Sequence, residues 1–141
     1  MTQHITRAED LPVPAGVYEI QFRNIPMTYV NFANTNEAEF LTVIQSAERM
    51  IRKPGNEGKV ITLTNMDKAK YNPVTMKAVD LYAKANEPYV LARSVIGLND
   101  MKRIAFNFIQ RISRMNMRAH DSPLDALEWL AGEVRNSPLV R

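Results

Sequence analysis

Two short apolar runs constrain the fold of this chain more than any other feature of its sequence. Residues 60–64 (VITLT) and 89–97 (YVLARSVIG) are nearly unbroken and rich in β-branched side chains. Such runs are typical of strands that are buried on both faces of a sheet. A helix that begins at Asn72 and Pro73, a cap residue followed by proline, separates them. Strands separated by a helix pair in parallel through a crossover, so an α/β fold is predicted.

The segment before these runs predicts an antiparallel component. Residues 17–24 alternate between apolar and polar side chains, as in a half-buried strand, and residues 27–33 follow as a second strand. The short link between them favours a hairpin. The other expected elements are a helix that opens with a capping box of Asn36 and Glu39, a helix over 100–114, a strand over 117–120 and a helix after Ser122. The predicted fold is a mixed sheet in the order β-β-α-β-α-β-α-β-α.

The 141 residues are about one domain's worth of chain. We expect a single domain over residues 17–135, a C-terminal tail over 136–141 and a loose N-terminal arm over 1–16. Two prolines near the end of that arm favour extended backbone.

The composition excludes several classes of site and compartment. There is no cysteine, so disulfides, thiolate zinc sites and cysteine nucleophiles are ruled out. The first 16 residues hold no apolar stretch of the kind a signal peptide needs. No apolar run approaches the ~20 residues of a membrane-spanning helix. We therefore expect a cytoplasmic protein with no transmembrane segment.

Three stretches resemble a known family. They are KVITLTNMDKAKYNP (59–73), PYVLARSVIGLNDMKRIAFNFIQRIS (88–113) and RAHDSPLDALEWL (118–130), which together span about half the chain. They are similar to the STAS-like (SpoIIAA-like) family of small bacterial α/β proteins, whose element order is also the one predicted above. The resemblance implies a non-enzymatic regulatory or ligand-binding module whose ligand or protein partner the sequence does not identify. The sequence leaves open whether the protein forms a homo-oligomer.

The sequence departs from the regulatory members of that family at one important place. Those proteins usually carry an Asp-Ser pair followed by glycine where the helix after the central strand begins, and the serine is phosphorylated. Here the corresponding residues 71–75 read Tyr-Asn-Pro-Val-Thr, and Thr75 is the nearest hydroxyl. A phosphorylation switch is therefore not carried over to this chain.

Polar residues at the ends of the two buried strands form the main candidate site. The carboxyl edge of a parallel sheet is where ligands bind in open α/β proteins. The helix that begins at Asn72 also presents free N–H groups there. The structural alternative is a capped helix beside a tight turn. The residues expected to contact a ligand or partner are Asn65, Asp67, Lys68, Asn72, Gly97 and Asn99.

A basic helix supports an alternative function. Residues 90–120 hold six basic side chains against one acidic side chain, Asp100. A stripe of this kind can bind the phosphates of nucleic acid or anionic lipid. The structural alternative, a solvated face that keeps the protein soluble, is favoured. The candidate anion-binding residues are Arg103, Asn107, Arg111 and Arg114.

The pair His120 and Asp121 supports a second alternative, a small hydrolase. That function needs a hydroxyl nucleophile within hydrogen-bond reach of His120. The structural interpretation, a partly buried ring at the end of a strand, is favoured. A metal site normally needs three or more ligands, and no second histidine is spaced to help. No catalytic residue, metal or cofactor is therefore assigned. Trp129, the only tryptophan, is expected to be largely buried as the anchor of the last helix.

Overall fold

The computed structural model describes residues 2–99 and 116–137 of the chain. Its elements, in chain order, are β1 (Gln3–Ile5), η1 (Ala8–Asp10), β2 (Gly16–Phe22), β3 (Ile25–Asn31), α1 (Glu37–Ile51), β4 (Val60–Asn65), α2 (Pro73–Asn86), β5 (Val90–Ile96), β6 (Met117–Ala119) and α4 (Pro123–Arg135). The predicted helix over 100–114 lies outside the described residues.

The six strands form one mixed sheet whose spatial order equals the chain order, β1-β2-β3-β4-β5-β6. β2 and β3 are antiparallel, and all other neighbours are parallel. The predicted hairpin and the parallel pairing of the two apolar runs are therefore confirmed. The hairpin turn consists of Arg23 and Asn24, both with positive φ (50° and 65°), which is the geometry of a tight two-residue connection.

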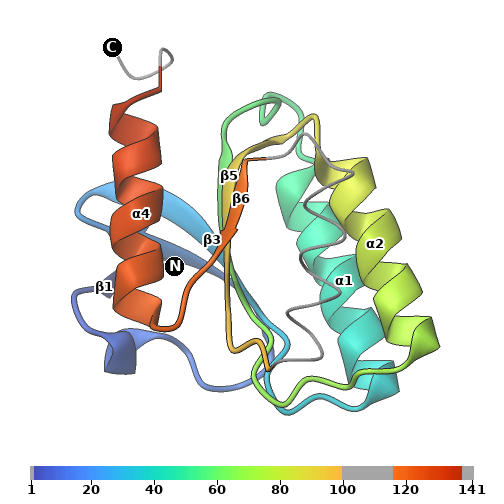
Figure 1. Cartoon of the computed structure of the whole chain (residues 1–141). Coiled ribbons are helices and arrows are strands. Elements are labelled where there is room, and N and C mark those ends of the chain that lie inside the picture. Colours follow the sequence, from blue (N-terminus) through green and yellow to red (C-terminus); the bar gives the residue numbers. More distant parts are fainter. Residues whose placement is uncertain (1, 100–115, 138–141) are drawn as a thin grey trace.

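The molecule has three layers, with α1 and α2 on one face of the sheet and α4 on the other (Figure 1). The α1 and α2 side holds a core that includes the stacked rings of Phe32 and Phe40, whose centroids are 4.4 Å apart. The α4 side holds a second core around Leu127 and Leu130. The central strands contribute side chains to both cores, as expected of strands buried on both faces. An α/β protein with a mixed sheet is therefore confirmed.

The helix starts follow the sequence signals. The Asn36 side chain accepts a hydrogen bond from the Glu39 amide, and the Glu39 carboxylate accepts one from the Asn36 amide. Asn72 caps α2 in the same manner, with Pro73 as the first helical residue. None of the helices in the described part of the chain has the length and apolar character needed to span a bilayer.

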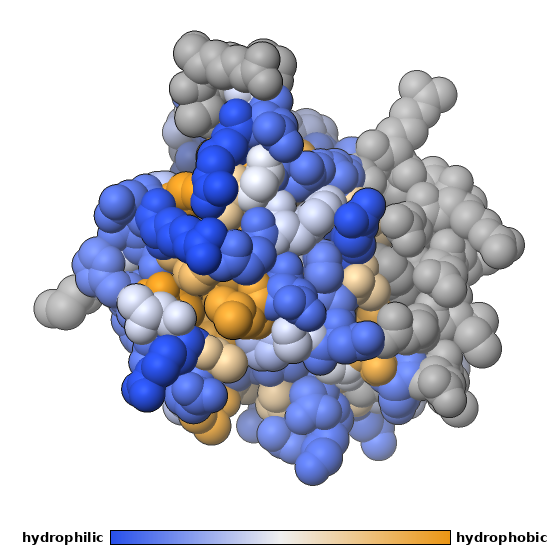
Figure 2. Space-filling model, turned by 60° about the vertical axis from the view of Figure 1, so that its left-hand side comes forward, coloured by the Kyte–Doolittle hydropathy of each residue, from blue (hydrophilic) through white to orange (hydrophobic). Residues whose placement is uncertain are grey.

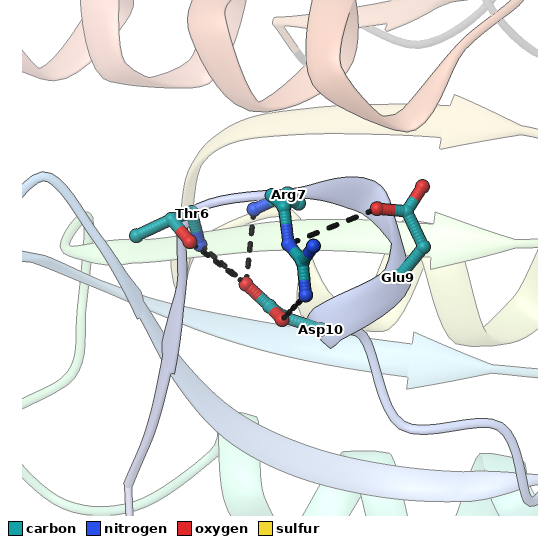
Figure 3. Close-up of polar contacts among 4 residues, drawn as sticks. All are labelled: Thr6, Arg7, Glu9 and Asp10. Atoms are coloured by element: carbon teal, nitrogen blue, oxygen red, sulfur yellow. Dashed lines mark hydrogen bonds and ion pairs between the residues drawn. The ribbon is translucent and has the colours of Figure 1, made fainter.

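The N-terminal segment differs from the loose arm that the sequence predicts. Residues 3–5 pair in parallel with β2, and the side chain of Ile5 is buried against the α4 layer. Asp10 closes the following turn, since its Oδ2 atom accepts hydrogen bonds from the Thr6 amide, the Thr6 hydroxyl and the Arg7 amide at 2.9–3.0 Å (Figure 3). A three-residue strand is too short to show a period in the sequence, which explains the difference.

The Asp10 carboxylate is the charged centre of this turn. The hydrogen bond from the Thr6 amide, followed by that from the Arg7 amide, holds the pKa of Asp10 below its usual range. A lowered pKa means that the ionised form is the one favoured by folding. Its contribution is therefore present above the unfolded pKa of about 3.9 and is lost as the pH falls through the lower folded value.

We expect Asp10→Ala to loosen β1 without unfolding the domain, because it removes three acceptor contacts at the surface. Amide hydrogen exchange should become faster at Thr6 and Arg7 and leave β4 and β5 unchanged. Glu9→Ala is the matched control, since Glu9 makes only a 3.9 Å exposed ion pair with Arg7. Equal exchange in the two variants would show that Asp10 does not hold the turn.

Candidate functional site

The structure brings three of the predicted site residues together at the carboxyl ends of β4 and β5. The Asp67 amide donates to Oδ1 of Asn65 at 3.0 Å. Gly97 lies directly against this turn, because a Cβ atom there would be 2.5 Å from the backbone nitrogen of Asp67. Its φ of +79° is also in the region that favours glycine. The two loops are thus packed against each other with no room for a side chain between them.

The amide side chains at this edge are occupied by contacts within the protein. Asn65 donates from Nδ2 to the Tyr29 hydroxyl at 3.1 Å, in addition to accepting from Asp67. Asn72 accepts from the Thr75 amide and donates from Nδ2 to Glu37 at 2.9 Å, which ties the start of α2 to the start of α1. These groups hold loops and helix ends in place, so a ligand would have to compete with existing hydrogen bonds.

Two of the remaining predicted residues, Lys68 and Asn99, lie in the described part of the chain. Lys68 adopts a positive φ of 53° within the β4–α2 loop. Asn99 closes the first described segment and has a partner of its own. The basic stripe of Arg103, Asn107, Arg111 and Arg114 lies outside the described residues. Its function stays a prediction.

The order of the strands explains why their carboxyl ends form no open crevice. Ligand crevices in open α/β sheets form where the strand order reverses and neighbouring connections run to opposite faces. From β3 to β6 the order does not reverse, and α1 and α2 cover the same face. The loops at the strand ends therefore pack side by side.

Thr75, the hydroxyl nearest to the family's phosphorylation position, is fully buried. Its Oγ1 atom donates toward the Lys70 carbonyl at 2.9 Å and accepts from the Asn72 amide at 3.1 Å. This hydroxyl completes the cap of α2 and is closed to a modifying enzyme in this fold.

A cavity lies elsewhere, between α2 and the sheet. Its volume is about 60 Å³, and its lining is almost entirely apolar. The lining side chains come from the α1 and α2 face of the sheet, from α2 and from the residue after Gly97: Phe32, Thr64, Met66, Met76, Val79, Tyr82, Ala83, Arg93, Val95, Leu98 and Met117. The face seen in Figure 2 is mainly hydrophilic, with hydrophobic residues in small areas.

Arg93 places a guanidinium group in this apolar cavity. It lies on β5 opposite Thr62 of β4 and is only 4% exposed. Its Nε atom donates to the Thr62 hydroxyl at 3.2 Å, and its guanidinium carbon lies 5.3 Å from the centre of the Tyr82 ring. Its Nη2 atom is buried without a hydrogen-bond partner.

The charge of Arg93 is poorly compensated. Across residues 2–99 and 116–137, no carboxylate forms an ion pair with it. Desolvation lowers the pKa of the Arg93 guanidinium, and the interaction with Tyr82 opposes that effect. An arginine nevertheless keeps its proton in proteins, so the cavity has a fixed positive charge in its wall.

Thr64 adds a second unpartnered polar group. It is 6% exposed, two residues after Thr62 on β4, and its Oγ1 atom has no hydrogen-bond partner. Tyr82 contributes its ring to the lining, and burial raises the pKa of its hydroxyl. The cavity lining thus combines apolar side chains with one cationic residue and two hydroxyls, those of Thr64 and Tyr82, that have no hydrogen-bond partner.

Sequence reasoning did not select Arg93, Thr64 or Tyr82 as site residues. One signal was present, because Arg93 is the only charged residue within 89–97, a run predicted to be buried on both faces. A charge at a buried position is rare and needs a partner or a function. No comparable signal marks Thr64 or Tyr82.

The hydroxyl neighbour that a hydrolase would require is present but enclosed. Ser94 Oγ lies 2.7 Å from Nδ1 of His120, yet Ser94 is 0% exposed. Across the described part of the chain, no group of three histidine or acidic side chains is arranged to hold a metal ion. The pair therefore links β5 to the residue after β6, and the serine is shut off from a substrate.

Trp129 is partly buried and packs against the core on the α4 side of the sheet. Its ring packs against the edge of the sheet, 5.5 Å from the His120 ring and 5.3 Å from the guanidinium of Arg118. The buried side of α4 consists of Ala126, Leu127, Leu130 and Ala131. Leucine and alanine therefore anchor this helix, and the indole covers His120.

Comparisons with protein-family models, with curated proteins and with solved structures found no match to this chain.

We expect Gly97→Ala to destabilise the protein by roughly 1–3 kcal/mol more than Gly55→Ala, the scale of an overpacked site. Both positions have positive φ, but nothing lies within 4 Å of a Cβ at Gly55. The difference in the free energy of unfolding, measured in urea, isolates the contact with Asp67. Equal losses would mean that the two loops are not packed as described.

We expect the stability of the protein to fall on mild acidification because of His120. Burial, and then the nearby Arg118 charge, lower the pKa of His120 below its usual 6.5. A lowered pKa favours the neutral ring in the folded state, so this contribution is present above about 6.5 and is lost as the pH falls through the folded value. His120→Asn should remove that part of the pH dependence in urea unfolding between about pH 7 and pH 5. An unchanged pH profile would contradict this assignment.

Proposed function

We propose that this chain is a non-enzymatic regulatory or ligand-binding module of the STAS-like type, and that it holds a small molecule in the cavity beneath α2. The observation that carries the proposal is that three residues of an otherwise apolar cavity lining, Arg93, Thr64 and Tyr82, each hold a buried polar atom without a hydrogen-bond partner. We further propose that it acts in the cytoplasm.

The energetics favour a ligand over a purely structural cavity. Nearly all buried polar groups in folded proteins have hydrogen-bond partners. A buried donor left unpaired costs about 1–3 kcal/mol, and a charged one costs more. A protein with no use for Arg93 would gain stability from an apolar residue there. A bound molecule that pairs with the guanidinium offsets this cost and explains why the residue is tolerated.

The STAS-like part of the proposal is supported by the arrangement of the elements. A leading hairpin is followed by parallel strands joined through helices, and all strands lie in one sheet. The buried Thr75 does not support a phosphorylation switch. In this proposal, occupancy of the cavity takes the place of phosphorylation as the signal.

The two alternatives have less support. A hydrolase would need Ser94 to reach a substrate, and Ser94 is enclosed on the α4 side of the sheet. Binding of nucleic acid or anionic lipid through Arg103, Asn107, Arg111 and Arg114 depends on residues outside the described part, and it stays a prediction.

Native mass spectrometry of the protein from the cells that produce it tests the proposal. We expect a small molecule to remain bound to the wild-type chain. Ala83→Leu should abolish this, because Ala83 lines the cavity and the longer side chain fills it. Ala85→Leu is the matched control, since Ala85 is exposed on the same helix.

Two results would contradict the proposal. One is a small molecule retained equally by the wild type and by Ala83→Leu, which would place the ligand elsewhere. The other is a chain without any bound molecule that also shows no amide shifts at cavity residues when titrated with small organic fragments.

A further inference from the structure

We infer that the ligand is a small organic carboxylate, with its anionic group at Arg93 and Thr64 and a short apolar chain among the methionines of the cavity. This inference rests on the proposed function and names the chemical class of the molecule bound.

The sign of the charge follows from Arg93. The guanidinium is always protonated, it is almost completely buried, and within residues 2–99 and 116–137 it has no carboxylate partner. An isolated charge in an apolar environment is very costly unless it is paired. A neutral or cationic ligand would leave that cost in place, whereas an anion removes it.

The free atoms define what the anion must offer. Nε of Arg93 is already bonded to Thr62, and the Tyr82 ring lies against the guanidinium, so the orientation of the group is fixed. Nη2 remains as a donor, and the unpartnered hydroxyls of Thr64 and Tyr82 can also donate. A carboxylate accepts hydrogen bonds only and has about four lone-pair sites, so it can satisfy all three donors.

The rest of the wall selects a short apolar chain. Apart from Arg93, Thr64 and the buried Tyr82 hydroxyl, the lining residues in the described part of the chain offer hydrocarbon, aromatic rings and three methionines, Met66, Met76 and Met117. A cavity of about 60 Å³ has room for about four to six water-sized groups, at roughly 10–15 Å³ for each. That excludes nucleotides and whole lipids and fits a chain of a few carbons. Methionine side chains adapt to different shapes, so a range of such chains can fit.

The test uses butyrate and its neutral analogue butyramide, titrated into the full chain at constant ionic strength. Binding is followed by calorimetry and by amide shifts together with the Nε–H signal of Arg93. We expect butyrate to bind about ten- to a hundredfold more tightly than butyramide, the usual effect of a hydrogen bond to a charged group. The shifts should centre on β4, β5 and α2.

Two variants assign the effect to the cavity wall. Arg93→Met should fold, since an apolar residue of similar length usually replaces a buried charge well, and it should lose the preference for butyrate. Arg118→Met is the control, because Arg118 is exposed on the neighbouring strand β6. If Arg93→Met does not fold, Thr64→Val tests the carboxylate assignment instead. This substitution removes a hydroxyl that has no partner in the ligand-free protein. It should weaken butyrate binding severalfold at unchanged stability.

The outcomes separate the inference from the proposed function. Equal binding of butyrate and butyramide, or binding unaffected by Arg93→Met and Thr64→Val, would overturn the carboxylate assignment and leave a ligand-binding cavity. Binding of inorganic phosphate with no response to butyrate would also overturn it. If neither probe perturbs the cavity and no molecule accompanies the natural protein, the proposed function fails as well.

Discussion

Consecutive parallel pairing of β3, β4, β5 and β6 is the constraint on which the rest of this structure depends. Because each strand lies beside the next one in the chain, α1 and α2 cover the same face. Among the described residues, the opposite face is covered by α4, with help from the N-terminal segment. The same order removes the crevice at which α/β sheets usually bind ligands, and an apolar cavity lies instead between α2 and the sheet.

Much of this architecture could be predicted from the sequence because its signals are local and strong. The two apolar runs, the alternation over 17–24 and the caps at Asn36 and Asn72 each specify one element, and each is found. The N-terminal segment could not be predicted, because β1 depends on contacts far along the chain and on the turn closed by Asp10. The sequence also did not show that alanine and leucine, rather than Trp129, form the fully buried side of α4.

The candidate site was less predictable than the fold. Sequence reasoning placed Asn65, Asp67 and Gly97 at one edge, and they do meet there, but it could not show that their polar groups are used by the loops themselves. The cavity is formed by side chains from three strands and a helix, and no short motif records that arrangement. The one signal of this cavity in the sequence is Arg93, a charged residue within a strand that is predicted to be buried.

The short strands at the two ends of the sheet have a consequence for how the protein behaves at high concentration. An exposed edge with free N–H and C=O groups invites pairing with another chain, and this is a common route to aggregation. β1 and β6 have only three residues each, so each edge presents a short row of such groups. β1 also shields β2, a seven-residue strand that would otherwise form the border. The residues of β1 thus limit the pairing of this sheet with the sheets of other molecules.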